Sequence, residues 1–158
     1  MPSFQEASRM PAFILVLFVL NFIIFGAIYW YKANPVILWV GVSVLLIGIF
    51  LISIKLSLNV HANGISYQLF PFHMKEREIG WEQLDEAKLV RISALRDFGG
   101  WGLRYSGSHG WGYIMNGVWG LKISTKDGTK FVLSVKEQQQ LRDFLKDENL
   151  EQYIVFEE

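Results

Sequence analysis

Histidine side chains are the first residues in this sequence that could bind a metal or carry a proton. The three histidines, His61, His73 and His109, lie 12 and 36 residues apart, and each falls in or beside a predicted turn. A metal site needs several ligands that converge on one point, and the sequence has no cysteine to join them. We therefore expect ordinary surface histidines and no bound metal.

Carboxylates and glycine motifs predict no catalytic site. Glu82, Asp85 and Glu86 share one charged turn, whereas paired catalytic acids need a cleft that separates their pKa values. The sequence has no phosphate-binding loop and no nucleophile elbow, and Gly100-x-Gly102 lacks the third glycine of a dinucleotide loop. We expect a non-enzymatic protein without cofactors; a membrane-associated enzyme is the remote alternative.

Arginines and aromatic residues between positions 91 and 119 form the candidate interaction surface. Such a surface could bind single-stranded nucleic acid, a peptide or an anionic lipid headgroup. The alternative is that the rings close a β-barrel while the arginines are solvated or paired with Asp97. Residues 55–158 carry 13 Lys/Arg and 14 Asp/Glu, and this net charge of −1 argues against nucleic acid. The candidate residues are Arg91, Arg96, Trp101, Arg104, Trp111, Tyr113 and Trp119.

The charge distribution divides the chain into two parts. Between Arg9 and Lys55 the only charged residue is Lys32, although 19% of the whole chain is charged. Residues 11–31 and 35–54 are apolar, and about 20 helical residues cross a hydrocarbon core of about 30 Å. A buried soluble helix and a cleaved signal peptide are the alternatives, but the first run is longer than a signal sequence needs. We therefore predict a transmembrane helical hairpin over residues 11–54.

Small residues and charges predict how this hairpin is arranged. Gly26, Gly41 and Gly48 would form its helix–helix seam, since small side chains let helices approach closely in lipid. Asn21 would donate a hydrogen bond across the seam. We expect the hairpin to lie in the cell (inner) membrane. More positive charge lies at the two ends of the hairpin than in its loop, so we expect both termini and the β domain to be cytoplasmic.

The rest of the chain reads as a β domain with short flanking tails. Ser134 and Glu137 match a capping box that would begin a helix over 135–147. The predicted fold is α+β: the hairpin, then a seven-stranded antiparallel β-barrel or sandwich over 55–148 that carries this C-terminal helix, with tails at 1–10 and 149–158. The predicted strands cover residues 55–60, 65–72, 87–92, 100–105, 110–115, 121–125 and 130–134.

Several motifs then suggest a family. Trp81-Glu82-Gln83-Leu84 is a Trp-led turn, 99–104 and 116–121 are glycine-rich, and Lys126-Asp127-Gly128 is a hairpin turn. In this order, after two membrane helices, the chain resembles small bacterial membrane proteins with pleckstrin-homology-like (PH-like) domains. The resemblance implies a non-enzymatic, membrane-tethered domain of a family mostly of unknown function, with oligomerisation among its implied properties. Eukaryotic domains of this fold bind phosphoinositides through Lys and Arg around the first hairpin. We do not expect such binding here, because the first hairpin turn at 61–64 has no Lys or Arg.

These observations favour a binding or assembly module. The expected partners are the lipid bilayer and either a second copy or another membrane protein, with no nucleic acid and no metal. The alternative is lipid-headgroup sensing through Arg91, Arg96 and Arg104.

Overall fold

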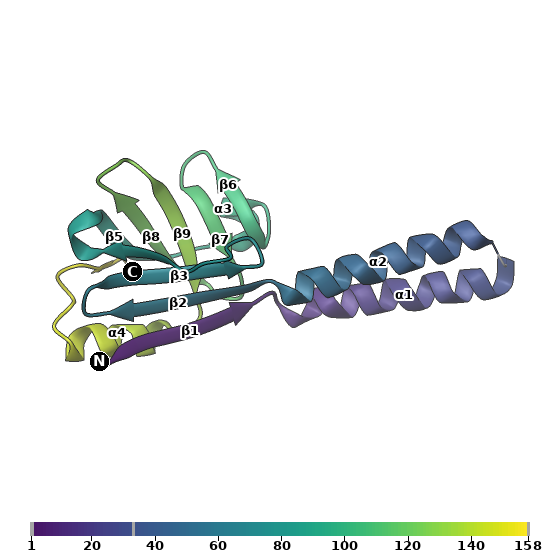
Figure 1. The fold of residues 1–158 in the computed structure, drawn as a ribbon, viewed down its shortest axis with the longest axis horizontal. Helices are drawn as coiled ribbons and strands as arrows, with labels where there is room; N and C mark the ends of the chain where they lie inside the picture. The colour runs from purple at the N-terminus through teal and green to yellow at the C-terminus, as the bar shows by residue number, and fades with distance from the viewer. Residues whose placement is uncertain (1, 33, 158) are drawn as a thin grey trace. The chain divides into compact units, whose positions relative to one another are not determined.

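The computed structural model describes residues 2–32 and 34–157 (Figure 1). By contacts the chain divides into two compact units. The first is a β unit made from the residues up to Arg9 and those from Lys55 onward, and the second is the helical unit Met10–Ile54. The N-terminal residues therefore belong to the β unit and are not a tail.

The helical unit consists of α1 (Ala12–Lys32) and α2 (Pro35–Ser53). Both helices are long and apolar enough to cross a membrane, and their bounds agree with the predicted ones to within a residue. The second helix begins sharply, because the Asn34 side chain accepts a hydrogen bond from Val36 N at 2.9 Å and Pro35 occupies the first turn.

Two of the three seam glycines lie where the helices touch. Gly41 and Gly48 are buried, and a Cβ at these positions would lie 3.4 Å from Phe25 and 3.3 Å from Phe18. A Cβ at Gly26 would meet no atom of the described residues within 4 Å, so Gly26 lies outside the seam. Asn21 does not bond across the seam either: its Nδ2 donates to Leu17 O at 2.9 Å in the same helix, which satisfies the amide locally.

The β unit holds ten strands in two sheets among the described residues. The first sheet has the order β1-β2-β3-β4, and the second has the order β10-β5-β8-β9-β7-β6. The α+β class is confirmed, but the predicted seven-stranded antiparallel barrel or sandwich is not confirmed in detail, since the strands number ten and β7–β9 and β5–β10 pair in parallel. The strands are β1 (Ser3–Arg9), β2 (Lys55–His61), β3 (Gly64–Phe70), β4 (Arg77–Gly80), β5 (Leu84–Arg91), β6 (Gly102–Ser106), β7 (Gly110–Ile114), β8 (Trp119–Thr125), β9 (Lys130–Val135) and β10 (Val155–Phe156).

Strand β1 shows why the N-terminal segment escaped prediction. Its inward side chains are Phe4, Glu6 and Ser8, so its buried face lacks the apolar alternation that normally reveals a strand. It pairs antiparallel with β2 from Ser3 to Arg9, and Arg9 lies opposite Lys55. The two strands thus form a β-hairpin in which the helical unit takes the place of the turn.

The C-terminal helix α4 covers Gln138–Asp147 and does not begin with the predicted capping box. Ser134 lies inside β9, where its Oγ accepts a hydrogen bond from Met115 N at 2.9 Å. Glu137 precedes the helix without making a side-chain cap. Instead, the carboxylate of Glu6 in β1 accepts from Lys136 N at 2.8 Å and from Glu137 N at 2.9 Å.

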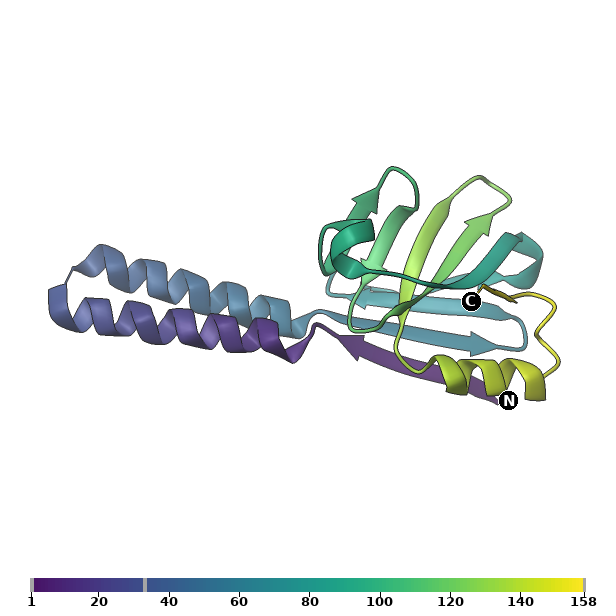
Figure 2. The same cartoon turned by 180° about the vertical axis from the view of Figure 1, so that it is seen from behind.

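Short elements complete the β unit. Helix α3 (Ala94–Phe98), which was not predicted, begins after Ser93 and ends at Gly99 in a left-handed conformation. It lies beside β6 and β7, as Figure 2 shows. The predicted C-terminal tail contains β10, and its Ile154 is 1% exposed. The core contains the fully buried side chains Leu56, Ile65, Leu69, Leu89, Ile114, Met115, Leu121, Ile123, Leu133, Leu141, Leu145 and Ile154.

Candidate functional site

The predicted cationic aromatic surface does not form one face. Arg96 pairs with Asp97 on α3, with 3.2 Å between Nε and Oδ1. Arg104 Nε donates to Trp101 O at 3.0 Å, and the Trp101 ring packs against the buried cluster that contains Phe98. These side chains are therefore occupied with the local structure of the α3–β6 segment.

The remaining members of that set lie in other places. Arg91 ends β5 opposite Trp119 on β8. Tyr113 is buried, whereas Trp111, on the same face of β7, is 48% exposed. The rings of Trp111 and Tyr105 meet edge to face, with 5.4 Å between their centroids. Of the predicted residues, Trp111 and Tyr113 come together in one cavity.

That cavity is one of three adjoining hollows beside β4, of about 750, 480 and 390 Å³. The first and second share Glu82 and Gln83, and the second and third share Tyr67, Thr129 and Phe131. All four residues of β4 line one or another of them. We call the three together the β4 groove, with an acidic end, a middle and an aromatic end.

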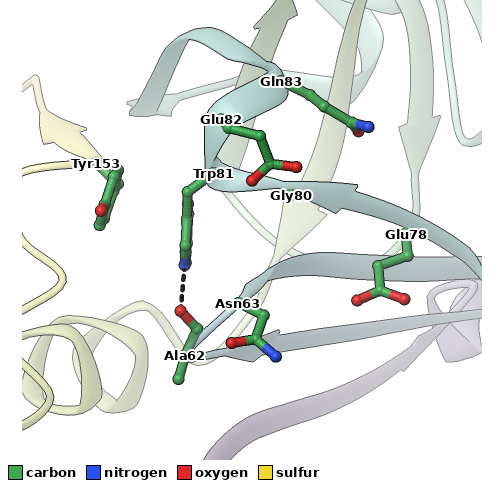
Figure 3. A pocket seen from close by; sticks show the side chains of 8 residues that line it. All are labelled: Ala62, Asn63, Glu78, Gly80, Trp81, Glu82, Gln83 and Tyr153. Carbon is green, nitrogen blue, oxygen red and sulfur yellow. Dashed lines mark hydrogen bonds between the residues drawn. The ribbon is translucent and has the colours of Figure 1, made fainter.

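The acidic end of the groove is built around Trp81 (Figure 3). The indole Nε1 donates to Ala62 O at 2.8 Å, and Tyr153 stacks on the ring with centroids 4.7 Å apart. On the other side of the ring from Tyr153 lies the carboxylate of Glu82, with Glu78 further along β4. An aromatic face beside carboxylates suits a cationic group.

Local backbone packing places Trp81 there. Trp81 N donates to Asn63 O at 3.3 Å, which ties the short 3₁₀ turn Trp81–Gln83 to the β2–β3 turn. Gly64 lies opposite Gly80, and a Cβ on Gly64 would collide with the carbonyl oxygen of Ile79. Only glycine at position 64 therefore lets β3 and β4 approach this closely.

The aromatic end contains a packed group of rings. Tyr67 lies with its centroid 5.4 Å from Tyr113, 5.1 Å from Phe131 and 5.8 Å from His73. Burial raises the pKa of Tyr113 to about 12, and its hydrogen bond with Tyr67 adds to the shift. Tyr113 therefore stays protonated at neutral pH and acts as a hydrogen-bonding wall of the cavity, not as a base.

His73 is an anchor for the loop that leads into β4. Its Nδ1 accepts a hydrogen bond from Leu69 N at 3.3 Å, and its backbone oxygen accepts from Gln68 Nε2 at 3.1 Å. Burial lowers the pKa of His73, and the nearby charge of Arg77 lowers it further. The ring is therefore neutral at physiological pH, which leaves Arg77 as the cation among the residues lining this end.

The charged side chains of the groove are distributed over its three parts. Glu78 and Glu82 line the acidic end, Glu82 also lines the middle together with Lys126 and Asp127, and Arg77 lines the aromatic end. No group of three or more His, Asp or Glu side chains that could hold a metal ion occurs within residues 2–32 and 34–157. The sequence matches no protein-family model and no curated protein.

The groove depends on residues that the sequence analysis set aside. Glu82 was assigned to a solvated turn, and Tyr153 to a tail. The available signals were Trp81 at a turn and the apolar run that begins at Tyr153, for which the sequence leaves open whether it pairs with a sheet edge or stays unpaired.

Proposed function

We propose that this chain is a two-pass membrane protein that displays a PH-like β domain as a non-catalytic protein-binding module. The binding site is the β4 groove, and its ligand is an extended segment of a partner protein that carries a basic side chain. The observation that carries the proposal is the place of β4, an edge strand all of whose residues line the groove.

An edge strand can accept a further strand through its main chain. β4 pairs with β3 on one side and is the last strand of its sheet. A segment added beside it would gain backbone hydrogen bonds, and its successive side chains would point to opposite faces of the sheet. Glu78 and Gly80 line the acidic end, whereas Arg77 and Ile79 line the aromatic end and the middle. The groove therefore offers a pocket on each face.

The two pockets favour different side chains. A Lys or Arg fits the acidic end, where Trp81, Glu78 and Glu82 offer an aromatic face and two carboxylates. An apolar side chain fits the aromatic end, where Trp111 and Phe131 line the cavity. Because backbone pairing is independent of sequence, these pockets would supply the specificity.

Site-specific photocrosslinking in intact membranes tests this proposal. A photoreactive residue replaces Gln83, which lines two parts of the groove, or Gln139, an exposed control on α4. We expect a discrete protein adduct only from position 83, and its loss when Glu78→Lys and Glu82→Lys are added. Identical adducts from both positions would refute the groove as the binding site.

The same edge supports self-assembly as a second candidate. Two copies could pair β4 with β4 about a two-fold axis, which would bury both open edges. In the crosslinking experiment this arrangement would give an adduct of twice the mass of the chain. A heterologous adduct would favour the first candidate.

For the membrane arrangement, we propose that α1 and α2 cross the cytoplasmic membrane and that both termini are cytoplasmic. The pairing of Arg9 with Lys55 supports an even number of crossings, because one sheet contains the residues on both sides of the hairpin. The positive charge at these two residues supports the cytoplasmic side. A C-terminal alkaline phosphatase fusion should be inactive, and an active fusion would reverse the orientation.

A further inference from the structure

One end of the β unit is defined by the two points at which the chain passes into the helical unit. Arg9 lies opposite Lys55 in the β1–β2 pair, and Lys55 lies opposite Phe70 in the β2–β3 pair. Neighbouring strands are about 4.8 Å apart, so these three residues form a short row across the sheet. Only Ile54 separates Lys55 from the last residue of α2.

The loop after Phe70 exposes large apolar side chains at this end. Phe70 is 47% exposed, Phe72 48% and Met74 82%. Single exposed apolar residues are normal on soluble domains, but a group of them marks an interaction surface. Lys75 follows and is exposed as well. Together with Arg9 and Lys55, the loop combines apolar side chains with three cations, and Glu76 after Lys75 adds one exposed carboxylate.

His73 orients this loop. Its ring is buried and bonded to Leu69 N, and its own backbone N donates to Leu69 O at 2.8 Å. The flanking side chains Phe72 and Met74 are consequently left on the outside, while His73 points inward. The exposure of the apolar side chains is thus a property of an anchored loop.

We propose that the rim formed by Phe70, Phe72, Met74, Lys75, Arg9 and Lys55 inserts into the interface of the bilayer that α1 and α2 cross. The apolar side chains would enter the boundary between headgroups and acyl chains, and the cations would lie among the lipid phosphates. This inference rests on the proposed membrane arrangement and is independent of the β4 groove.

Chain connectivity identifies lipid as the occupant. Ile54 is the one residue between α2 and Lys55, and one residue spans at most about 3.6 Å. A rim that includes Lys55 and its strand neighbour Phe70 must then lie close to the membrane boundary. Basic charge next to apolar side chains complements an interface that bears phosphates, and this does not require a second protein.

Fluorescent labelling of the full-length protein in lipid nanodiscs tests the rim. Since the chain has no cysteine, Met74→Cys, Lys126→Cys and Ile23→Cys each create one labelling site for an environment-sensitive dye. Lys126 is the exposed control. It follows Thr125 at the end of β8 and lines the middle of the β4 groove, whereas Asn116, which precedes the other end of β8, donates to Arg9 O. Ile23 reports on α1 itself.

We expect blue-shifted emission at position 74 and its quenching by lipid-borne quenchers, in phosphatidylcholine alone and more strongly when phosphatidylglycerol is added. Position 126 should stay in water and position 23 in lipid. A water-like signal at 74 beside a lipid signal at 23 would overturn the rim and leave the membrane arrangement intact. Water-like signals at both would overturn the membrane arrangement. A blue shift at 74 without lipid quenching would mean a protein contact and would also overturn the rim.

Discussion

The rest of the β unit covers one edge of the four-stranded sheet and leaves the other edge open. At one edge, β1 is held by other parts of the β unit: Glu6 accepts from two backbone N–H groups ahead of α4, and Arg9 O accepts from Asn116 N. At the other edge, β4 borders a groove. Exposed strand edges are a liability that proteins usually cover. Under the proposed function, the covered edge of this sheet would have a structural role and the open edge a binding role.

The largest expected effect comes from breaking the covered edge. Glu6→Ala should lower the free energy of unfolding of the β unit by about 2–3 kcal/mol, because two backbone N–H groups lose a charged acceptor. Chemical unfolding followed by tryptophan fluorescence measures the change. The matched control is Glu78→Ala on β4, whose carboxylate lies 3.6 Å from His61 Nε2 and is largely exposed, so that its loss should cost less than about 1 kcal/mol. Equal losses for the two variants would remove the contrast between the edges.

Charge reversal at the open edge should affect binding and leave the fold intact. Glu78→Lys together with Glu82→Lys should lower the affinity for an extended lysine-containing peptide about tenfold, or ~1.4 kcal/mol, because the altered end of the groove would repel the peptide's cation. Titration of full-length protein in detergent measures the affinity. Glu151→Lys, an exposed change in the C-terminal segment, should leave the affinity unchanged. If Glu151→Lys lowered the affinity for the peptide as much as the double variant, the effect would come from net charge and not from the groove.

Tyr153 lines the groove and also stacks on Trp81. Tyr153→Ala should cost about 1 kcal/mol of stability through the lost stacking on Trp81 and should also weaken the peptide. Tyr153→Phe keeps the ring and should preserve both properties. A loss with Phe as large as with Ala would assign the effect to the hydroxyl group and not to stacking.

The smallest expected effect is a pH dependence at the loop before β4. His73 has a pKa below its usual value near 6.5 in the folded protein, so the unfolded chain binds the proton more readily. The stabilisation is complete above about pH 6.5 and is lost as the pH falls toward the folded pKa. His73→Gln should flatten the dependence of stability on pH between about 7 and 5. An unchanged slope in His73→Gln would exclude this histidine as the cause.

Local patterns accounted for much of the fold. Uniform apolarity located both helices, and the turns Asn63-Gly64 and Asp127-Gly128 correctly marked the hairpins β2–β3 and β8–β9. These elements are visible in sequence because the residues that determine them are neighbours. Three strands, β1, β4 and β10, were not placed. The partners of β1 and β10 lie far away in sequence and their own patterns are short or polar, and the charged residues of β4 were interpreted as a connection.

The groove could not be predicted for the same reason. It joins Trp81 to Tyr153, 72 residues apart in sequence, and it joins β4 to rings from β3, β7 and β9. The cap ahead of α4 was missed because its acceptor, Glu6, lies 130 positions before Lys136. A capping box at Ser134 satisfied the local rule, but the alternation of β9 turned that side chain toward Met115 N.

The pairing of β1 with β2 also determines the order in which the molecule can be assembled. During synthesis β1 is made first, and its partner does not exist until both apolar helices have been completed. Strand β1 therefore has no strand partner until β2 has been made, and the β1–β2 pair forms only afterwards. A chain that lacked residues 2–9 would leave an open slot beside β2, and a free peptide of that sequence could fill it from outside. Under the proposed membrane arrangement, the β1–β2 pair would therefore form only after the helical hairpin has been made and inserted.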